Sequence, residues 1–282
     1  MTLPTFLGIG VPRAGTTWLH AFLAAHPEVY LPTARKEIRF FDRYFDHGVP
    51  WYEAFFCPPE NAGRYRAIGE ISPQYLYCTD CPRRIRETLP GVKLIVLLRH
   101  PVDRAYSNYG FVVQRRNYRR SFEEFIAARP QALDKGFYSE HLRQYLRYFD
   151  RSDLLALVFE EAVTDREATG NVLAEFLGVS ADRFPSEVGK VNASTVPRHG
   201  SASDLAVRLG RTLRRKRLEP VVDLAARLGG RRLIAKGEPL PRLDPSLKRD
   251  LSRRFEEEFD RLEDLLHLDL HRWRSEVAED AV

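Results

Sequence analysis

Short apolar runs separated by stretches of helical spacing mark the first two-thirds of the chain. The strand-like runs are Phe6–Val11, Ala67–Ile71, Lys93–Leu98 and Leu154–Phe159. Apolar residues recur at helical spacing over about Thr17–Ala25 and in the stretches that follow Pro101, Tyr138 and Asp165. This alternation is typical of a parallel sheet wrapped by helices, so we expect an α/β fold with four or five parallel strands.

The last third of the chain has a different pattern. Leu205–Leu233 is rich in arginine, with apolar residues at helical spacing and an interruption at Gly229-Gly230. We expect residues 200–235 to form a helical, arginine-rich cap inserted into the fold. Asp244-Pro245 then supplies a cap and a first-turn proline for a long amphipathic helix that ends at about Leu266. No repeat or low-complexity linker divides the chain, and we expect residues 1–282 to form one domain.

Composition limits the class of protein. The 282 residues are 44% hydrophobic and 29% charged, which is enough apolar material for a large core and is not typical of a disordered chain. The longest aliphatic runs are far shorter than the roughly 20 residues of a membrane-spanning helix. No basic residue precedes the first apolar run, so we predict no signal peptide and a cytoplasmic location.

The three cysteines do not indicate a disulfide framework. Cys78 and Cys81 are separated by two residues, but no second pair completes a four-ligand zinc site. We expect ordinary thiols at both positions.

Charge is distributed unevenly along the chain. The net charge is +5, yet Arg198–Arg254 holds 16 Lys and Arg against 6 Asp and Glu. This segment has three interpretations: a solvated helix face, a site for an anionic acceptor, or a surface for membranes or nucleic acid. The stretch Leu205–Lys236 contains no Phe, Tyr or Trp, which disfavours nucleic acid as a partner.

A glycine-containing turn follows the first strand. The segment Gly10–Trp18 reads GVPRAGTTW, and such a loop at a helix start aims backbone N–H groups at one point, which suits a phosphate or sulfate. A nucleotide triphosphatase would carry Lys and then Ser or Thr after the second glycine. Here Thr16-Thr17 follows Gly15, and Arg13 is the only cation of the loop.

A second anion site is predicted after the strand Lys93–Leu98. This strand ends at Arg99, where a P-loop kinase would usually carry an aspartate for magnesium. Ser107 follows eight residues later on the next helix, so a guanidinium and a hydroxyl can bind one phosphate. No metal is needed for this chemistry.

Together these segments resemble the sulfotransferases that use 3′-phosphoadenosine 5′-phosphosulfate (PAPS). PRAGTTWL resembles their 5′-phosphosulfate loop and LLRHPVDRAYSNYGF their 3′-phosphate motif. The segments KEIRFFD (Lys36–Asp42), WYEAFF (Trp51–Phe56) and GEISPQYL (Gly69–Leu76) resemble the heparan sulfate branch, and GFYSEHLRQYL is similar to a helix of that branch.

The resemblance implies a set of residues that bind PAPS and its product, adenosine 3′,5′-bisphosphate (PAP). They are Arg13, Ala14, Gly15, Thr16, Thr17, Trp18, Arg99, Ser107, Tyr138, Lys236 and Gly237. For Trp18 and Tyr138, an adenine contact and a place in the core both stay open.

The resemblance also implies catalytic roles. Glu37 matches the glutamate that serves as base in the heparan sulfate branch, and Glu70 or a histidine are the alternatives. Arg13 occupies the position of the family's catalytic lysine and would stabilise the leaving phosphate, although arginine cannot act as a general acid. Ile71 and Glu238 replace basic residues of the family, and Lys36 supplies some of the missing positive charge.

The sequence therefore predicts a PAPS-dependent sulfotransferase that acts on an acceptor hydroxyl, with an amine as the alternative acceptor. The implied acceptor is a carbohydrate, a glycoconjugate or a small-molecule natural product. The cap and the aromatic residues of Phe40–Phe56 are expected to line its cleft, namely Phe40, Phe41, Tyr44, Phe45, Trp51 and Tyr52. The alternatives are a P-loop phosphotransferase that uses ATP and magnesium, and a nucleotide-binding module without catalysis.

Overall fold

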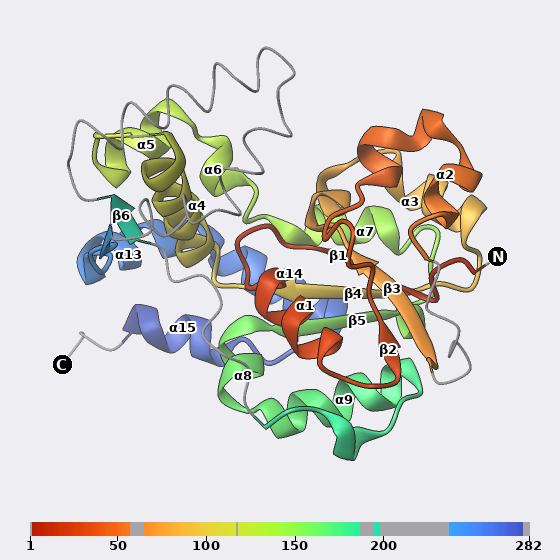
Figure 1. Cartoon of the computed structure of the whole chain (residues 1–282). Helices are drawn as coiled ribbons and strands as arrows, with labels where there is room; N and C mark the ends of the chain where they lie inside the picture. Colours follow the sequence, from red (N-terminus) through yellow and green to blue (C-terminus); the bar gives the residue numbers. More distant parts are fainter. Residues whose placement is uncertain (1, 57–64, 117, 187–194, 198–236, 279–282) are drawn as a thin grey trace, which may run out of the picture. The chain divides into compact units, whose positions relative to one another are not determined.

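A computed structural model describes residues 2–56, 65–116, 118–186, 195–197 and 237–278. Its centre is a five-stranded sheet in the order β2-β3-β1-β4-β5, with all neighbouring strands parallel (Figure 1). The strands are β1 (Phe6–Gly10), β2 (Val29–Tyr30), β3 (Ala67–Ile71), β4 (Lys93–Leu98) and β5 (Leu154–Val158). The predicted α/β fold and number of strands are confirmed.

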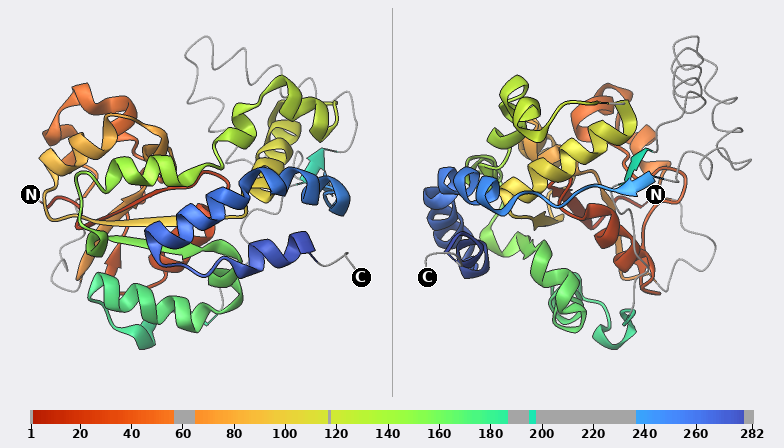
Figure 2. Two further views of the ribbon diagram at one scale, coloured as in Figure 1. Left: turned by 180° about the vertical axis from the view of Figure 1, so that it is seen from behind. Right: turned by 90° about the vertical axis from the view of Figure 1, so that its left-hand side faces the viewer.

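Helices cover both faces of this sheet. In Figures 1 and 2, α1 (Thr16–Ala24), α8 (Phe159–Thr164) and α9 (Arg166–Leu177) lie on one face, with α3 (Cys81–Thr88) and α7 (Tyr138–Tyr145) on the other. The helices predicted near Thr17, Tyr138 and Asp165 are confirmed, as is α4 (Pro101–Arg116). Among the described residues, no helix has the length and hydrophobicity to cross a bilayer.

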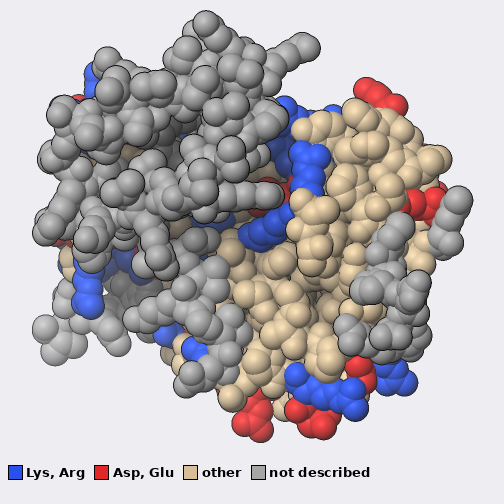
Figure 3. All heavy atoms as spheres, in the orientation of Figure 1, with Lys and Arg blue, Asp and Glu red and all other residues tan. Residues whose placement is uncertain are grey.

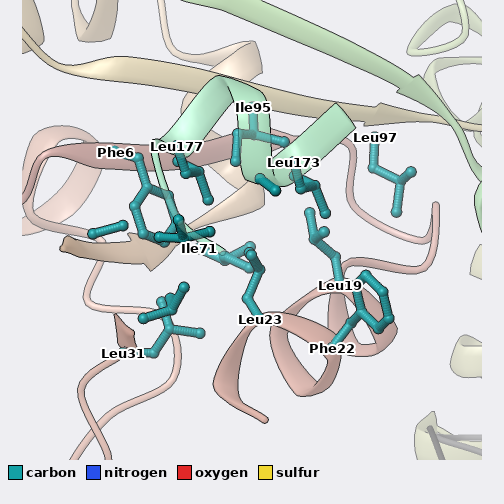
Figure 4. Packing of buried hydrophobic residues seen from close by; sticks show 14 of the residues in the cluster. Phe6, Leu19, Phe22, Leu23, Leu31, Ile71, Ile95, Leu97, Leu173 and Leu177 are labelled. Carbon is teal, nitrogen blue, oxygen red and sulfur yellow. The ribbon is translucent and has the colours of Figure 1, made fainter. Parts of the chain in front are cut away.

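One cluster of the hydrophobic core lies between the sheet and the helices α1 and α9. Figure 4 shows Leu19, Phe22 and Leu23 of α1 packed with Leu173 and Leu177 of α9 against strand residues. The strand residues are Phe6, Ile71, Ile95 and Leu97, all 0% exposed. Burial of each large apolar side chain contributes roughly 1.5–3 kcal/mol to the free energy of folding. This cluster therefore stabilises the sheet from which the loops of the site extend.

The chain divides into two compact units. The first comprises Met1–Arg104, Leu133–Val191 and Pro245–Val282, and it contains the sheet; the second comprises Ala105–Ala132 and Asn192–Asp244. In the second unit, α5 (Phe122–Ala128) begins with a capping box at Ser121, and β6 (Thr195–Pro197) pairs antiparallel with β7 (Gly237–Pro239). The predicted cap, residues 200–235, lies outside the described residues.

The C-terminal helix differs from the prediction. Instead of one helix from Pro245 to Leu266, α13 (Pro245–Ser252) and α14 (Glu256–Leu266) are separated by a 3-10 turn, Arg253–Phe255. The Ser252 hydroxyl donates a hydrogen bond to the Lys248 carbonyl at 2.7 Å, a local bond that bends helices. A last helix, α15 (His271–Ala278), follows.

The prediction for the paired cysteines is wrong. Cys78 and Cys81 form a disulfide at the start of α3. The Cys81 amide donates to the Cys78 carbonyl at 3.3 Å, and this turn brings the two Cα atoms to 5.3 Å, within the range that a disulfide spans.

Candidate active site

Three neighbouring parallel strands end at one edge of the sheet, because β1 pairs with β3 on one side and with β4 on the other. The loop Val11–Gly15 follows β1, Glu70 lies near the end of β3, and Arg99 follows β4. In open α/β sheets, ligands bind at this carboxyl edge. The predicted loop residues and two charged residues from the neighbouring strands therefore share the expected place.

The loop after β1 presents the start of α1. Gly15 caps this helix in the left-handed conformation, with φ of 86°, and no side chain caps the helix amides. A Cβ at Gly15 would lie 2.2 Å from the Phe159 ring, so only glycine fits. Ala14 and Thr16 are buried, whereas Arg13 and Thr17 are half-buried. The positive end of the helix is therefore available to an anion.

Lys36 links the loop helix to the KEIRFF segment. Its Nζ donates a hydrogen bond to Thr17 Oγ1 at 2.6 Å. Burial lowers the pKa of Lys36; the charge of Glu37 acts to raise it and the charge of Arg13 to lower it further. The ammonium, the carboxylate and the guanidinium thus lie close enough to interact. Figure 3 shows a short band of Lys and Arg side chains near the middle of the face in view.

Arg99 lies beside the same loop. Its Nη1 donates to the Arg13 carbonyl at 3.3 Å, and its Cζ lies 5.1 Å from the centre of the Phe159 ring. The Arg99 Nε is buried and has no hydrogen-bond partner among the described residues. A buried guanidinium N–H without a partner is costly, and an anionic ligand would satisfy it.

Tyr138 and Trp18 lie in the core. Tyr138 is 0% exposed, and its hydroxyl donates to the Arg99 carbonyl at 2.9 Å, which fixes the backbone that carries the guanidinium. Trp18 is 8% exposed and stacks on Phe22 with 5.1 Å between ring centres. Contacts of either ring with adenine stay predictions.

The remaining predicted ligands lie elsewhere in the chain. Ser107 is half-buried on α4, and Gly237 begins β7; both belong to the second compact unit. Lys236 lies outside the described residues. Their part in a phosphate site stays a prediction.

The candidate base Glu37 lies in a segment without helix or strand. It is half-buried, and side chains near the end of β3 bind the backbone amides of the two residues that follow it. The Ile38 amide donates to Glu70 Oε2 at 3.2 Å, and the Arg39 amide donates to the Ser72 hydroxyl at 3.0 Å.

Glu70, the alternative base, is enclosed by hydrogen-bond donors. The residue is 1% exposed. Its Oε1 accepts from the hydroxyls of Tyr52 at 2.8 Å and Tyr75 at 2.7 Å, and its Oε2 accepts from the Ser72 hydroxyl at 2.6 Å as well as from the Ile38 amide. Burial raises the pKa of Glu70, while these bonds act to lower it. With both oxygens occupied and no exposed surface, Glu70 is poorly placed to take a proton from a substrate.

Half of the aromatic residues expected to line an acceptor cleft belong to the core. Phe40, Phe41 and Tyr52 are 0% exposed, and Tyr52 stacks on Phe40 at 4.4 Å. The prediction is wrong for these three. Trp51 does line a cavity of about 380 Å³, together with Tyr30, Thr33, Ala34, Ala54 and Phe55.

The sequence analysis missed Glu160, a half-buried carboxylate that is bonded to the residue following Arg99. Glu160 accepts hydrogen bonds from the His100 amide at 3.1 Å and from Trp273 Nε1 at 3.2 Å. His100 is 0% exposed, and its Nε2 lies 3.4 Å from the Ser252 hydroxyl. The only signal in the sequence was the buried strand that runs directly into Arg99 and His100.

Comparison with known proteins identifies the family. The sequence model of the sulfotransferase domain family matches residues 3–196, and the chain belongs to this family. It is 33% identical over 196 residues to the human bifunctional heparan sulfate N-deacetylase/N-sulfotransferase 3, covering 63% of this chain and 22% of that protein. It is also 33% identical over 184 residues to the mouse heparan sulfate glucosamine 3-O-sulfotransferase 6, covering 62% of this chain and 52% of that protein.

A solved structure supports the fold over nearly the whole chain. A sulfotransferase from Alicyclobacillus acidocaldarius superposes with a TM-score of 0.70 at 24% identity, covering 97% of this chain and 100% of that one. The matched parts of the heparan sulfate relatives make up between about a fifth and about half of their lengths. The predicted sulfotransferase family and its fold are thus confirmed.

Proposed function

We propose that this chain transfers a sulfuryl group from PAPS to a hydroxyl, or less readily an amine, of a carbohydrate or glycoconjugate. The relatives named for heparan sulfate support this acceptor class, and they include both N- and 3-O-sulfotransferases. The observation that carries the proposal is the bond from Lys36 to Thr17, because it brings the Glu37 segment to the helix that begins at the glycine turn.

The donor site has the chemistry that PAPS requires. The N-terminus of α1, Arg13 and Lys36 would hold the 5′-phosphosulfate, and the unsatisfied Nε of Arg99 points to a second anionic group, which we assign to the 3′-phosphate. Ser107, Lys236 and Gly237 would complete the 3′-phosphate site. PAPS supplies an activated sulfuryl group whose departure leaves negative charge on the 5′-phosphate.

Each residue then has one task. Glu37 accepts the proton of the acceptor as its oxygen or nitrogen attacks sulfur in line. Arg13 and Lys36 stabilise the charge that develops on the leaving phosphate, together with the helix amides. Arg13 stays protonated throughout, since a guanidinium does not give up its proton at neutral pH.

The test is sulfuryl transfer from ³⁵S-labelled PAPS to N-desulfated heparan sulfate and to simple phenols. Glu37→Gln should lower kcat about 10²- to 10⁴-fold, the range of general-base contributions, while the Kd of PAP measured by calorimetry stays the same. The matched control is Glu175→Gln, at an exposed position of α9.

Three other results would contradict the proposal. Full activity of Glu37→Gln would show that Glu37 is not the base. Tight binding of ATP with magnesium and no binding of PAP would favour a phosphotransferase. Binding of PAP without turnover of any acceptor would favour a module without catalysis.

A further inference from the structure

Side chains near the end of β3 hold the Lys36–Arg39 segment in place. Because no helix or strand includes Glu37 or Ile38, their backbone has no regular partners, and buried amides must be satisfied elsewhere. The amides of Ile38 and Arg39 are bonded to Glu70 and Ser72, which lie near the end of β3. Arg39 has φ of 61°, a sharp turn that directs the chain into the buried Phe40.

The carboxylate of Glu70 connects these bonds into one network. An ionised carboxylate only accepts hydrogen bonds, and here four donors surround it. Its Oε2 faces the Ile38 amide and the Ser72 hydroxyl, which itself accepts from the Arg39 amide. Its Oε1 is held by the tyrosines Tyr52 and Tyr75, both fully buried. Because the two tyrosines anchor Oε1, the Glu70 carboxylate can hold the Ile38 amide in a fixed position through Oε2.

We infer that Glu70, acting with Ser72, is a positioning residue for Glu37: Glu70 binds the amide of Ile38, Ser72 binds the amide of Arg39, and together they fix the direction of the Glu37 side chain. This inference rests on the proposed role of Glu37 as the base. Glu70 does not take part in proton transfer. Its role is to keep the Glu37 carboxylate within reach of the acceptor.

Two substitutions weaken the network on the side of Glu37. Ser72→Ala removes the acceptor of the Arg39 amide, and Glu70→Gln replaces a charge-assisted bond to the Ile38 amide by a weaker neutral one. We expect kcat to fall about 10- to 100-fold in Ser72→Ala and about 10-fold in Glu70→Gln, since small misplacements of a catalytic group have effects of this size. The Kd of PAP should stay within about 2-fold of the unsubstituted protein, because the donor loop is untouched.

Tyr52→Phe is the matched control. It removes one hydrogen bond from the same carboxylate, but from Oε1, where the bond from Tyr75 still anchors the group, and it keeps the ring that stacks on Phe40. We expect Tyr52→Phe to lose about as much stability as Ser72→Ala while its kcat changes less than about 3-fold. This result would separate a positioning effect from a general loss of stability. If kcat followed thermal stability equally in all variants, the inference would be wrong.

Hydrogen exchange gives a readout that does not depend on turnover. The amide of Arg39 in Ser72→Ala and that of Ile38 in Glu70→Gln should exchange at least about 10-fold faster, while amides of β1 keep their protection. Unchanged exchange at both positions would overturn the inference. If Ser72→Ala does not fold, Ser72→Cys keeps a similar volume with a much weaker acceptor and gives the same test.

A double-substitution cycle separates this inference from the proposed function. In a Glu37→Gln background, Ser72→Ala should cause no further loss of kcat, because its effect passes through Glu37. Independent, multiplicative losses would contradict positioning while leaving the base role intact. A fully active Glu37→Gln would instead contradict the proposed function.

Discussion

The two strands that flank β1 end in opposite charges with opposite surroundings. Glu70, on β3, is buried, and donors from the protein itself occupy both of its oxygens. The guanidinium of Arg99, after β4, donates a hydrogen bond of 3.3 Å to the Arg13 carbonyl, and its buried Nε has no partner among the described residues. A charged group whose hydrogen bonds are all made within the protein organises structure, whereas a buried N–H of a charged group that is left without a partner points to a ligand.

The strongest test of this contrast is removal of the satisfied charge. Glu70→Ala leaves four buried donors without an acceptor and should lower the free energy of unfolding by about 3–5 kcal/mol, measured by urea denaturation. Glu175→Ala, at an exposed site, is the control and should change it by less than about 0.5 kcal/mol. An equally small effect at Glu70 would show that the network does not stabilise the fold.

The next test concerns His100, the buried neighbour of Arg99. Burial lowers the pKa of His100 to about 4, from 6.5. The unfolded chain therefore binds the extra proton first as pH falls, and this residue should cost about 2–4 kcal/mol of stability between pH 6.5 and pH 4. Buried carboxyls with raised pKa values act in the opposite direction, so the measurement is the difference from His100→Asn, whose unfolding free energy should lack this component.

Removal of the Arg99 guanidinium should affect binding more than folding. Arg99→Ala should weaken PAP about 10- to 100-fold, which corresponds to the roughly 1.5–3 kcal/mol of a charged hydrogen bond. Calorimetry gives the Kd, and the unfolding free energy should change by less than about 1 kcal/mol. Arg147→Ala, at an exposed position, is the control. An unchanged Kd of PAP would show that Arg99 is not part of the donor site.

The smallest expected effect comes from the disulfide near Tyr75. Because Cys78 and Cys81 close a very short loop, the bond restricts the unfolded chain little, and Cys78→Ser with Cys81→Ser should lower stability by about 2 kcal/mol or less. Sulfuryl transfer by the double variant should stay near that of the unsubstituted protein. A large loss of kcat would show that the turn carrying Tyr75 depends on this bond.

The strands and the glycine turn could be predicted because their signals are local. β3 and β4 have the predicted bounds, since each is a short apolar run with clear limits. The two-residue strand β2 has too few residues for any periodicity, and it was not assigned. The C-terminal helix breaks directly after Ser252, whose hydroxyl bonds to the Lys248 carbonyl, and the amphipathic pattern does not reveal this bond.

The charged residues proposed for the site could be located from their motifs, whereas the residues that support them could not. Arg13, Glu37 and Arg99 stand in recognisable motifs, and their roles in the site stay predictions. The donors around Glu70 come from positions 2, 5, 18 and 32 residues away, a set of spacings without a period. For the same reason, sequence did not separate Phe40 and Tyr52, which are core, from Trp51, which lines a cavity.

The bond between Trp273 and Glu160 has a practical consequence for how the domain is delimited. The family match stops at residue 196. The Glu160 carboxylate, however, accepts a hydrogen bond from Trp273, which lies far beyond the end of that match. A fragment ending there would uncover fully buried aromatic surface and leave Glu160 without its indole donor; the residues removed include Phe255, Phe259 and Trp273. Such a truncated polypeptide should aggregate on expression, so the folding unit includes α15.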